Sequence, residues 1–205
     1  DNWESLDNSS GDGYVPLIKV PTGIFVQSLQ FSGASQVHVT GYIWQRYTKG
    51  IHDAIKPAPG EVGFILPERM DSTDSKEIYR IDYGDEELIG WYFDATLRQQ
   101  FDYVDYPFDH KTVWVRLWAR DFSQNIALVP DFSSYDSTGV SDIFGIEDEI
   151  VLGTWRRENT FFDYHFSSYD TNFGIRDYTG QDGFPEFQYN LVIKREYGNA
   201  FIVYL

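Results

Sequence analysis

The sequence predicts an all-β protein, an immunoglobulin-like antiparallel β-sandwich of about ten strands with little helix. Three observations support this fold class. Apolar and polar residues alternate along several segments, turn sequences rich in Gly and Pro separate those segments, and no long stretch repeats with a helical period. The chain has 205 residues, of which 42% are hydrophobic, so it is long enough for one domain with an ample core.

The elements follow this pattern along the chain. Residues 1–13 are polar and rich in Gly, Ser, Asn and Asp, and we expect them to form a loose lead-in to a sandwich that covers residues 14–205. Three segments alternate most clearly, because each places its apolar side chains on one face. These core faces are Val37, Val39, Ile43 and Tyr47; Val113, Val115, Leu117 and Ala119; and Phe187, Tyr189, Leu191 and Ile193.

The opposite faces of these strands carry large aromatic and arginine side chains. They are Tyr42, Trp44 and Arg46 in the first strand and Trp114, Arg116, Trp118 and Arg120 in the second. Loops that fold over the rings would explain them, and so would ordinary surface aromatics. Because Trp, Tyr and Arg are enriched where proteins bind one another or a ligand, we interpret these faces as a protein interface or ligand site.

The charge and the missing residue types exclude several functions. The chain carries 32 acidic and 16 basic residues, a formal charge of −16, which argues against nucleic-acid binding and against docking on anionic membranes. Without cysteine there is no disulfide, thiolate nucleophile or Cys-ligated metal. The four histidines lack metal-ligand spacing, and the acidic residues between 131 and 149 are interpreted as a solvated face. No catalytic motif occurs, so we expect neither enzyme activity nor a cofactor.

One motif resembles a known family. Tyr106-Pro107-Phe108-Asp109 is similar to the aromatic-Pro-Phe-Asp signature in the extracellular domain of pentameric ligand-gated ion channels, the Cys-loop receptor superfamily. In the animal receptors a cysteine lies seven residues before the first aromatic residue of the motif and another lies seven residues after it. Here Gln99 and Val113 occupy those positions, so the chain resembles the cysteine-free prokaryotic branch.

Further stretches follow the family in order and spacing over roughly residues 16–205. Segments 20–29 and 41–47 resemble its first two strands, and Leu66-Pro67-Glu68 resembles the element that opens loop A, with Ile65 where a Trp is usual. Residues 184–195 resemble the strand that leads into the first membrane helix. We therefore expect this chain to stop just before a transmembrane domain.

The resemblance implies a homopentamer in the cell membrane, with this domain facing the periplasm or extracellular space. A small-molecule ligand would bind between identical subunits and gate a pore, and the negative charge favours a cation pore. The implied ligand-binding residues are Tyr42, Trp44 and Tyr92 on one side and Arg120, Tyr178 and Phe184 on the other. Arg120 at the position of an aromatic residue implies an acidic ligand.

The implied coupling residues are Tyr106, Pro107, Phe108, Asp109 and Arg195, which in the family pass the conformational change to the membrane domain. An ion pair between Asp109 and Arg195 that only fixes the sheets is the structural alternative.

Two other functions remain open from the sequence. The same fold could serve as a sensor domain of another membrane signalling protein, since fold does not fix output. A secreted carbohydrate-binding β-sandwich would also display exposed Trp and Tyr and an acidic surface. The sequence identifies neither the agonist nor the ion selectivity.

Overall fold

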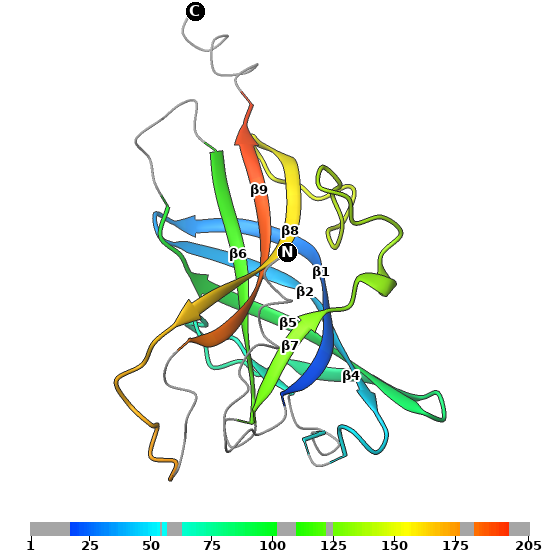
Figure 1. The fold of residues 1–205 in the computed structure, drawn as a ribbon. Coiled ribbons are helices and arrows are strands. Elements are labelled where there is room, and N and C mark those ends of the chain that lie inside the picture. The colour runs from blue at the N-terminus through cyan, green and yellow to red at the C-terminus, as the bar shows by residue number, and fades with distance from the viewer. Residues whose placement is uncertain are drawn as a thin grey trace, which may run out of the picture.

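The computed structural model describes residues 17–53, 55–56, 63–101, 110–121, 125–176 and 183–196. Within these ranges the chain forms nine strands and one short 3-10 helix (Figure 1). The elements are β1 (Ile18–Gly33), β2 (Gln36–Thr48), β3 (Phe64–Ile65), β4 (Lys76–Asp82), β5 (Glu86–Arg98), β6 (His110–Ala119), β7 (Ile126–Pro130), η2 (Phe132–Ser134), β8 (Trp155–Ser167) and β9 (Phe184–Arg195). The predicted lead-in and the stretch after residue 196 lie outside the described residues.

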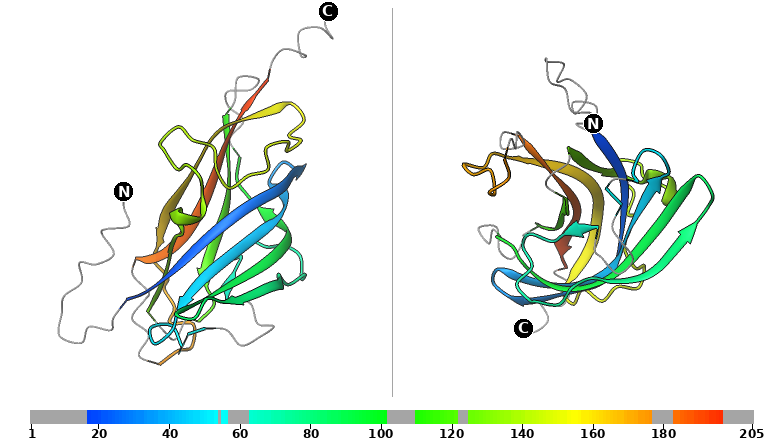
Figure 2. Two further views of the ribbon diagram at one scale, coloured as in Figure 1. Left: turned by 90° about the vertical axis from the view of Figure 1, so that its right-hand side faces the viewer. Right: turned by 90° about the horizontal axis from the view of Figure 1, so that it is seen from below.

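The strands form two sheets that pack face to face (Figure 2). One sheet has the order β4-β5-β2-β1-β7 and the other the order β3-β6-β9-β8. Neighbouring strands are antiparallel except β1 and β7, which pair in parallel from Ile18↔Ile126 to Thr22↔Pro130. The predicted all-β sandwich is therefore confirmed.

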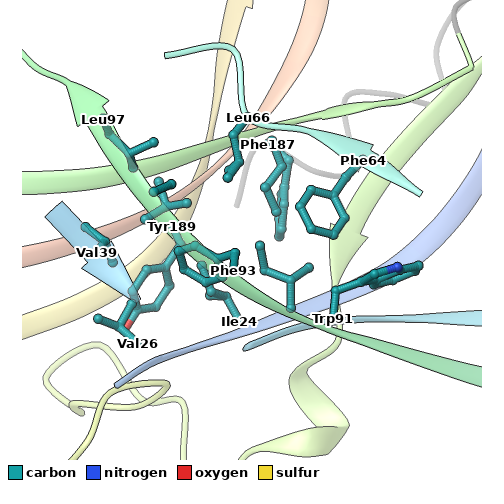
Figure 3. Packing of buried hydrophobic residues seen from close by; sticks show 14 of the residues in the cluster. Ile24, Val26, Val39, Phe64, Leu66, Trp91, Phe93, Leu97, Phe187 and Tyr189 are labelled. Carbon is teal, nitrogen blue, oxygen red and sulfur yellow. The ribbon is translucent and has the colours of Figure 1, made fainter. Parts of the chain in front are cut away.

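The core lies between the two sheets, as Figure 3 shows for part of it. All three predicted core faces are buried, from Val37 in β2 to Ile193 in β9. Trp91 and Phe93 of β5, which the sequence did not single out, are fully buried in the same cluster. Since strand side chains alternate, burying one face of each strand sends the other face outward. This alternation positions the candidate site.

The pairing of β9 with its neighbours defines two ends of the sandwich. At one end β6 begins, where His110 pairs with Lys194, just before β9 ends (Figure 1). At the other end the loop from β8 to β9 turns back, and Ser167 pairs with Phe184. We call the first the C-terminal end of the sandwich and the second the loop end. In the described part of the chain no helix is long and apolar enough to cross a membrane.

Candidate functional site

An arginine held between two carboxylates lies on the outer face of the four-stranded sheet, toward the loop end. Arg116 of β6 places its Nη1 atom 2.8 Å from Oε2 of Glu186 in β9 and 3.1 Å from Oε1 of Glu68, which follows β3. Arg116 pairs with Gln188 in the β6–β9 register, so Glu186, two residues away on the same face, is its diagonal neighbour. The Glu186 side chain has no exposed surface, whereas that of Glu68 is half-buried.

These groups influence one another electrostatically. Burial raises the pKa of Glu68, the guanidinium of Arg116 works against that rise, and the negative charge of Glu186 adds to it. One cation thus serves two carboxylates, and together the three groups have a net negative charge when all are ionised. A buried carboxylate needs a partner, and Arg116 provides one for Glu186 inside the protein.

Aromatic rings cover this ion triad. The rings of Trp118 in β6 and Phe184 in β9 lie 5.6 Å apart between centroids. Tyr169, from the β8–β9 loop, lies 5.8 Å from Trp118 and 6.2 Å from Phe184. The guanidinium of Arg116 lies 4.6 Å from the ring centre of Trp114, a cation–π contact.

Tyr169 joins the rings to the ion triad. Its hydroxyl donates a short hydrogen bond to Oε1 of Glu186. Burial, together with this bond to a carboxylate, raises the pKa of Tyr169 to about 12. The loop between β8 and β9 is therefore fastened onto the outer face of β6 and β9 through one hydroxyl and its ring contacts.

We call this group the Glu186 cluster. Its members are Glu68, Trp114, Arg116, Trp118, Tyr169, Phe184 and Glu186. Carboxylates and aromatic faces together suit binding of a small polar molecule. Among the residues that the structure describes, no group of three or more His, Cys, Asp or Glu side chains is arranged to hold a metal.

Two of the predicted ligand-binding residues form a pair on the other sheet. Tyr42 of β2 and Tyr92 of β5 are directly opposite in the register, and their rings meet edge to face at 5.4 Å. Both are half-buried on the outer face of the five-stranded sheet. Within one chain this pair and the Glu186 cluster lie on the outer faces of different sheets, and these outer faces point in opposite directions.

Trp44, a third predicted ligand-binding residue, is engaged inside the chain. Its Nε1 atom donates to Oδ2 of Asp131 at 2.9 Å, and its ring lies 5.6 Å from that of Tyr135. A Cβ atom at Gly23 would lie 2.2 Å from the indole, so the ring fills the space above the glycine. Loop residues fold over Trp44, and internal packing accounts for its place on the outer face.

The other predicted residues are distributed as follows. Phe184 belongs to the Glu186 cluster. Arg120 is exposed directly after β6, two residues beyond Trp118. Arg195, at the opposite end of the sandwich, places its guanidinium 4.2 Å from the ring centre of Trp155. Tyr178 lies outside the described residues, and so do Tyr106, Pro107, Phe108 and Asp109, so the predicted pair of Asp109 with Arg195 does too.

Sequence reasoning placed Arg116 on an outer face interpreted as an interface or ligand site, but it did not select Tyr169 or Glu186 as site residues. The sequence contained one signal for Glu186. This residue lies next to a proline, at an outward position between Phe184 and Gln188, and a charged side chain that is buried there needs a partner. The partner comes from β6 and the covering ring from a distant loop, so the set became evident only in three dimensions.

No protein-family model matches the chain, and no curated protein is significantly similar to it in sequence. The fold and the Glu186 cluster together define the class: an all-β sandwich that carries carboxylates and aromatic rings on the outer face of its four-stranded sheet.

Proposed function

We propose that the chain is the ligand-binding domain, extracellular or periplasmic, of a prokaryotic pentameric ligand-gated ion channel. In this proposal identical subunits form a homopentamer at the cell membrane, a small ligand binds between them, and binding gates a cation pore. The ligand acts by binding more tightly to the open state than to the closed state. The ordered motifs along the sequence and the two-sheet sandwich support this proposal.

The observation that carries most weight is the hydrogen bond from Tyr169 to the buried carboxylate of Glu186. It places a loop side chain on a buried charged group, and the ring of the same side chain contacts Trp118 and Phe184. A ligand that donates to Glu186 would compete with Tyr169 and change how the loop rests on the sheet. Ligand binding would thereby alter the position of a whole loop, as a sensor requires.

The charge of the cluster bears on the class of ligand. Two carboxylates and one guanidinium favour a ligand group that donates hydrogen bonds or is positively charged. The acidic ligand expected from Arg120 stays a prediction, and the described part of the cluster weighs against it. Proton, amine and carboxylate agonists are therefore all included in the tests below.

The pair Tyr42 and Tyr92 supports the subunit arrangement. It offers a second aromatic surface on the sheet opposite to the Glu186 cluster. In a ring of identical subunits one chain would present the Glu186 cluster and the next chain would present the tyrosine pair. Such a head-to-tail contact, unlike the self-complementary contact of a two-fold dimer, can repeat around a closed ring.

Cysteine cross-linking in the full-length protein tests this arrangement, because the chain has no cysteine of its own. We would place one cysteine in the tyrosine pair (Tyr92→Cys) and one on the exposed β8–β9 loop (Phe173→Cys). Oxidation in membranes is expected to give a ladder of products up to five chains. If the largest cross-linked product contains two chains while both cysteines remain accessible to a maleimide, the proposed ring of subunits is contradicted.

The same variants separate the proposal from a carbohydrate-binding module. A carbohydrate-binding module binds sugar as a monomer, so we expect it to bind sugar even when no cross-linked product forms. A receptor domain of the proposed kind gives the ladder and shows no sugar binding as a monomer.

A further inference from the structure

A buried amide joins the two sheets near the C-terminal end of the sandwich. Gln99, directly after β5, is only 2% exposed. Its Nε2 atom donates to the carbonyl of Trp114 in β6, and its Oε1 atom accepts the Trp114 amide at 3.4 Å. Its own backbone amide donates to Ser35, in the β1–β2 turn, at 2.8 Å. Through its side chain and its backbone amide, this one residue therefore connects three elements.

Within the described residues, the Gln99 amide takes the place of a neighbouring strand beside Trp114. β6 pairs with β9 along one edge, and on its other edge β3 pairs only with Trp118 and Ala119. The backbone of Trp114 at this second edge is satisfied by the Gln99 side chain instead. Buried backbone groups that lose their partner cost free energy, so this position requires a side chain with both a donor and an acceptor.

A buried ammonium group lies close by. Lys111 of β6 is 5% exposed, and its Nζ atom lies 4.9, 5.4 and 5.9 Å from the ring centres of Phe101, Trp155 and Phe31. The rings come from the segment after β5, from β8 and from β1, so a cation of one sheet is held partly by rings of the other.

The end of β9 is attached to this cage. The guanidinium of Arg195 lies 4.2 Å from the ring centre of Trp155, and the amide of Glu196 donates to Thr154 at 2.8 Å. The last residues of β9 are thus fixed to Trp155, which is itself fixed by Lys111 and Phe31.

We propose that Gln99 and Lys111 are positioning residues that hold the end of β9 against the five-stranded sheet. The fastening itself follows from these contacts alone. Its consequence rests on the proposed function: in the receptor, the two residues would transmit changes between the sheets to whatever follows Arg195, without touching ligand.

Amide hydrogen exchange on this chain tests the fastening. We expect Gln99→Met to speed exchange of the Trp114 amide by about tenfold or more, because its acceptor is lost. The neighbouring exposed Gln100→Met is the matched control and should change nothing. If Gln99→Met does not fold, Gln99→Asn keeps the amide but is one methylene too short, and the same acceleration is expected. Unchanged exchange in a folded Gln99 variant would overturn the proposal.

Lys111 has its own test with a rescue. Lys111→Met should speed exchange of the Glu196 amide, whereas Lys111→Arg should restore slow exchange because it returns a cation to the cage. The exposed Lys76→Met serves as control. If the Glu196 amide exchanges at the same rate in the Met and Arg variants, side-chain volume rather than charge holds the end of β9. That result would overturn the proposed role of Lys111.

Recordings from the full-length protein, with ethylamine and acetate as probes, test the consequence for gating. Gln99→Met should raise the concentration for half-maximal current by about tenfold, while probe affinity, measured by direct binding to the assembled pentamer, stays unchanged. A parallel loss of affinity would overturn the positioning role. If the wild type gives no current, the proposed function is contradicted. The fastening of the two sheets is then tested by the hydrogen-exchange measurements alone.

Discussion

The indole Nε1 of Trp44 donates to the carboxylate of Asp131 at 2.9 Å, joining the outer face of β2 to the turn that follows β7. Asp131 is 4% exposed and also accepts hydrogen bonds from Arg46 at 2.8 Å and from two serines of η2. Trp44 therefore belongs to the structural framework.

Asp131→Asn should lower the free energy of unfolding by about 3 kcal/mol, because it removes the charge that pairs with Arg46 and turns one acceptor oxygen into a donor. Urea unfolding measures the change. Asp136→Asn, at an exposed position in the same loop, is the control and should stay within about 0.5 kcal/mol of wild type. Equal stability of the two variants would show that Asp131 is dispensable.

Asp131 should also make stability depend on acid pH. Burial alone would raise its pKa, but hydrogen bonds from Ser133, Ser134, Arg46 and Trp44 outweigh burial and hold the pKa below its usual range. Since the folded pKa is depressed, the contribution is complete above the unfolded value of about 3.9 and is lost as the pH falls through the folded pKa. The stability difference between wild type and Asp131→Asn should therefore narrow below about pH 4. A difference that stays constant down to acid unfolding would refute this assignment.

Arg116→Met should destabilise the chain by about 3–5 kcal/mol, because it leaves Glu186 buried without its cation. The double variant Arg116→Met with Glu186→Gln should lose less than the sum of the two single changes, with a coupling of about 1–3 kcal/mol. Arg156→Met, at an exposed position in β8, is the control. Strict additivity in urea unfolding would mean that the two side chains do not stabilise each other.

The hydroxyl of Tyr169 should lose its proton only at a pH above the ordinary range for tyrosine. Its pKa is raised to about 12, so the difference in phenolate absorbance between wild type and Tyr169→Phe should appear only near that pH. Glu186→Gln removes the neighbouring charge and should shift the transition toward the ordinary value of about 10. A transition at the ordinary value in the wild type would mean that the hydroxyl does not rest on Glu186.

The fold was predictable because its signal is local. Alternation in β2, β6 and β9 marks residues such as Val39, Val115 and Leu191, and each of these is buried. The parallel pairing of β1 with β7 was not predictable, since it joins residues about a hundred positions apart and leaves no mark in either strand.

The candidate site was predictable only in part. The aromatic outward faces were visible in the sequence, and Phe184, a predicted ligand-binding residue, lies in the Glu186 cluster, where its role in ligand binding stays a prediction. Whether an outward ring is free or covered depends on loops, and this separates Trp44, covered by the Asp131 turn, from Tyr42 and Tyr92. Glu186 escaped detection because its burial depends on Arg116 and Tyr169, which come from elsewhere in the chain.

Current recording from the full-length protein, with Glu186→Gln beside wild type, tests the central claim most directly. Amines, carboxylates and pH steps are applied in turn, and the exposed Glu149→Gln is the control. We predict a ligand-gated current in the wild type and the control, and a shift of about tenfold or more in the half-maximal concentration for Glu186→Gln. Either of two results, with surface expression verified, would contradict the account: no current under any of these conditions, or dose responses that are identical in all three proteins.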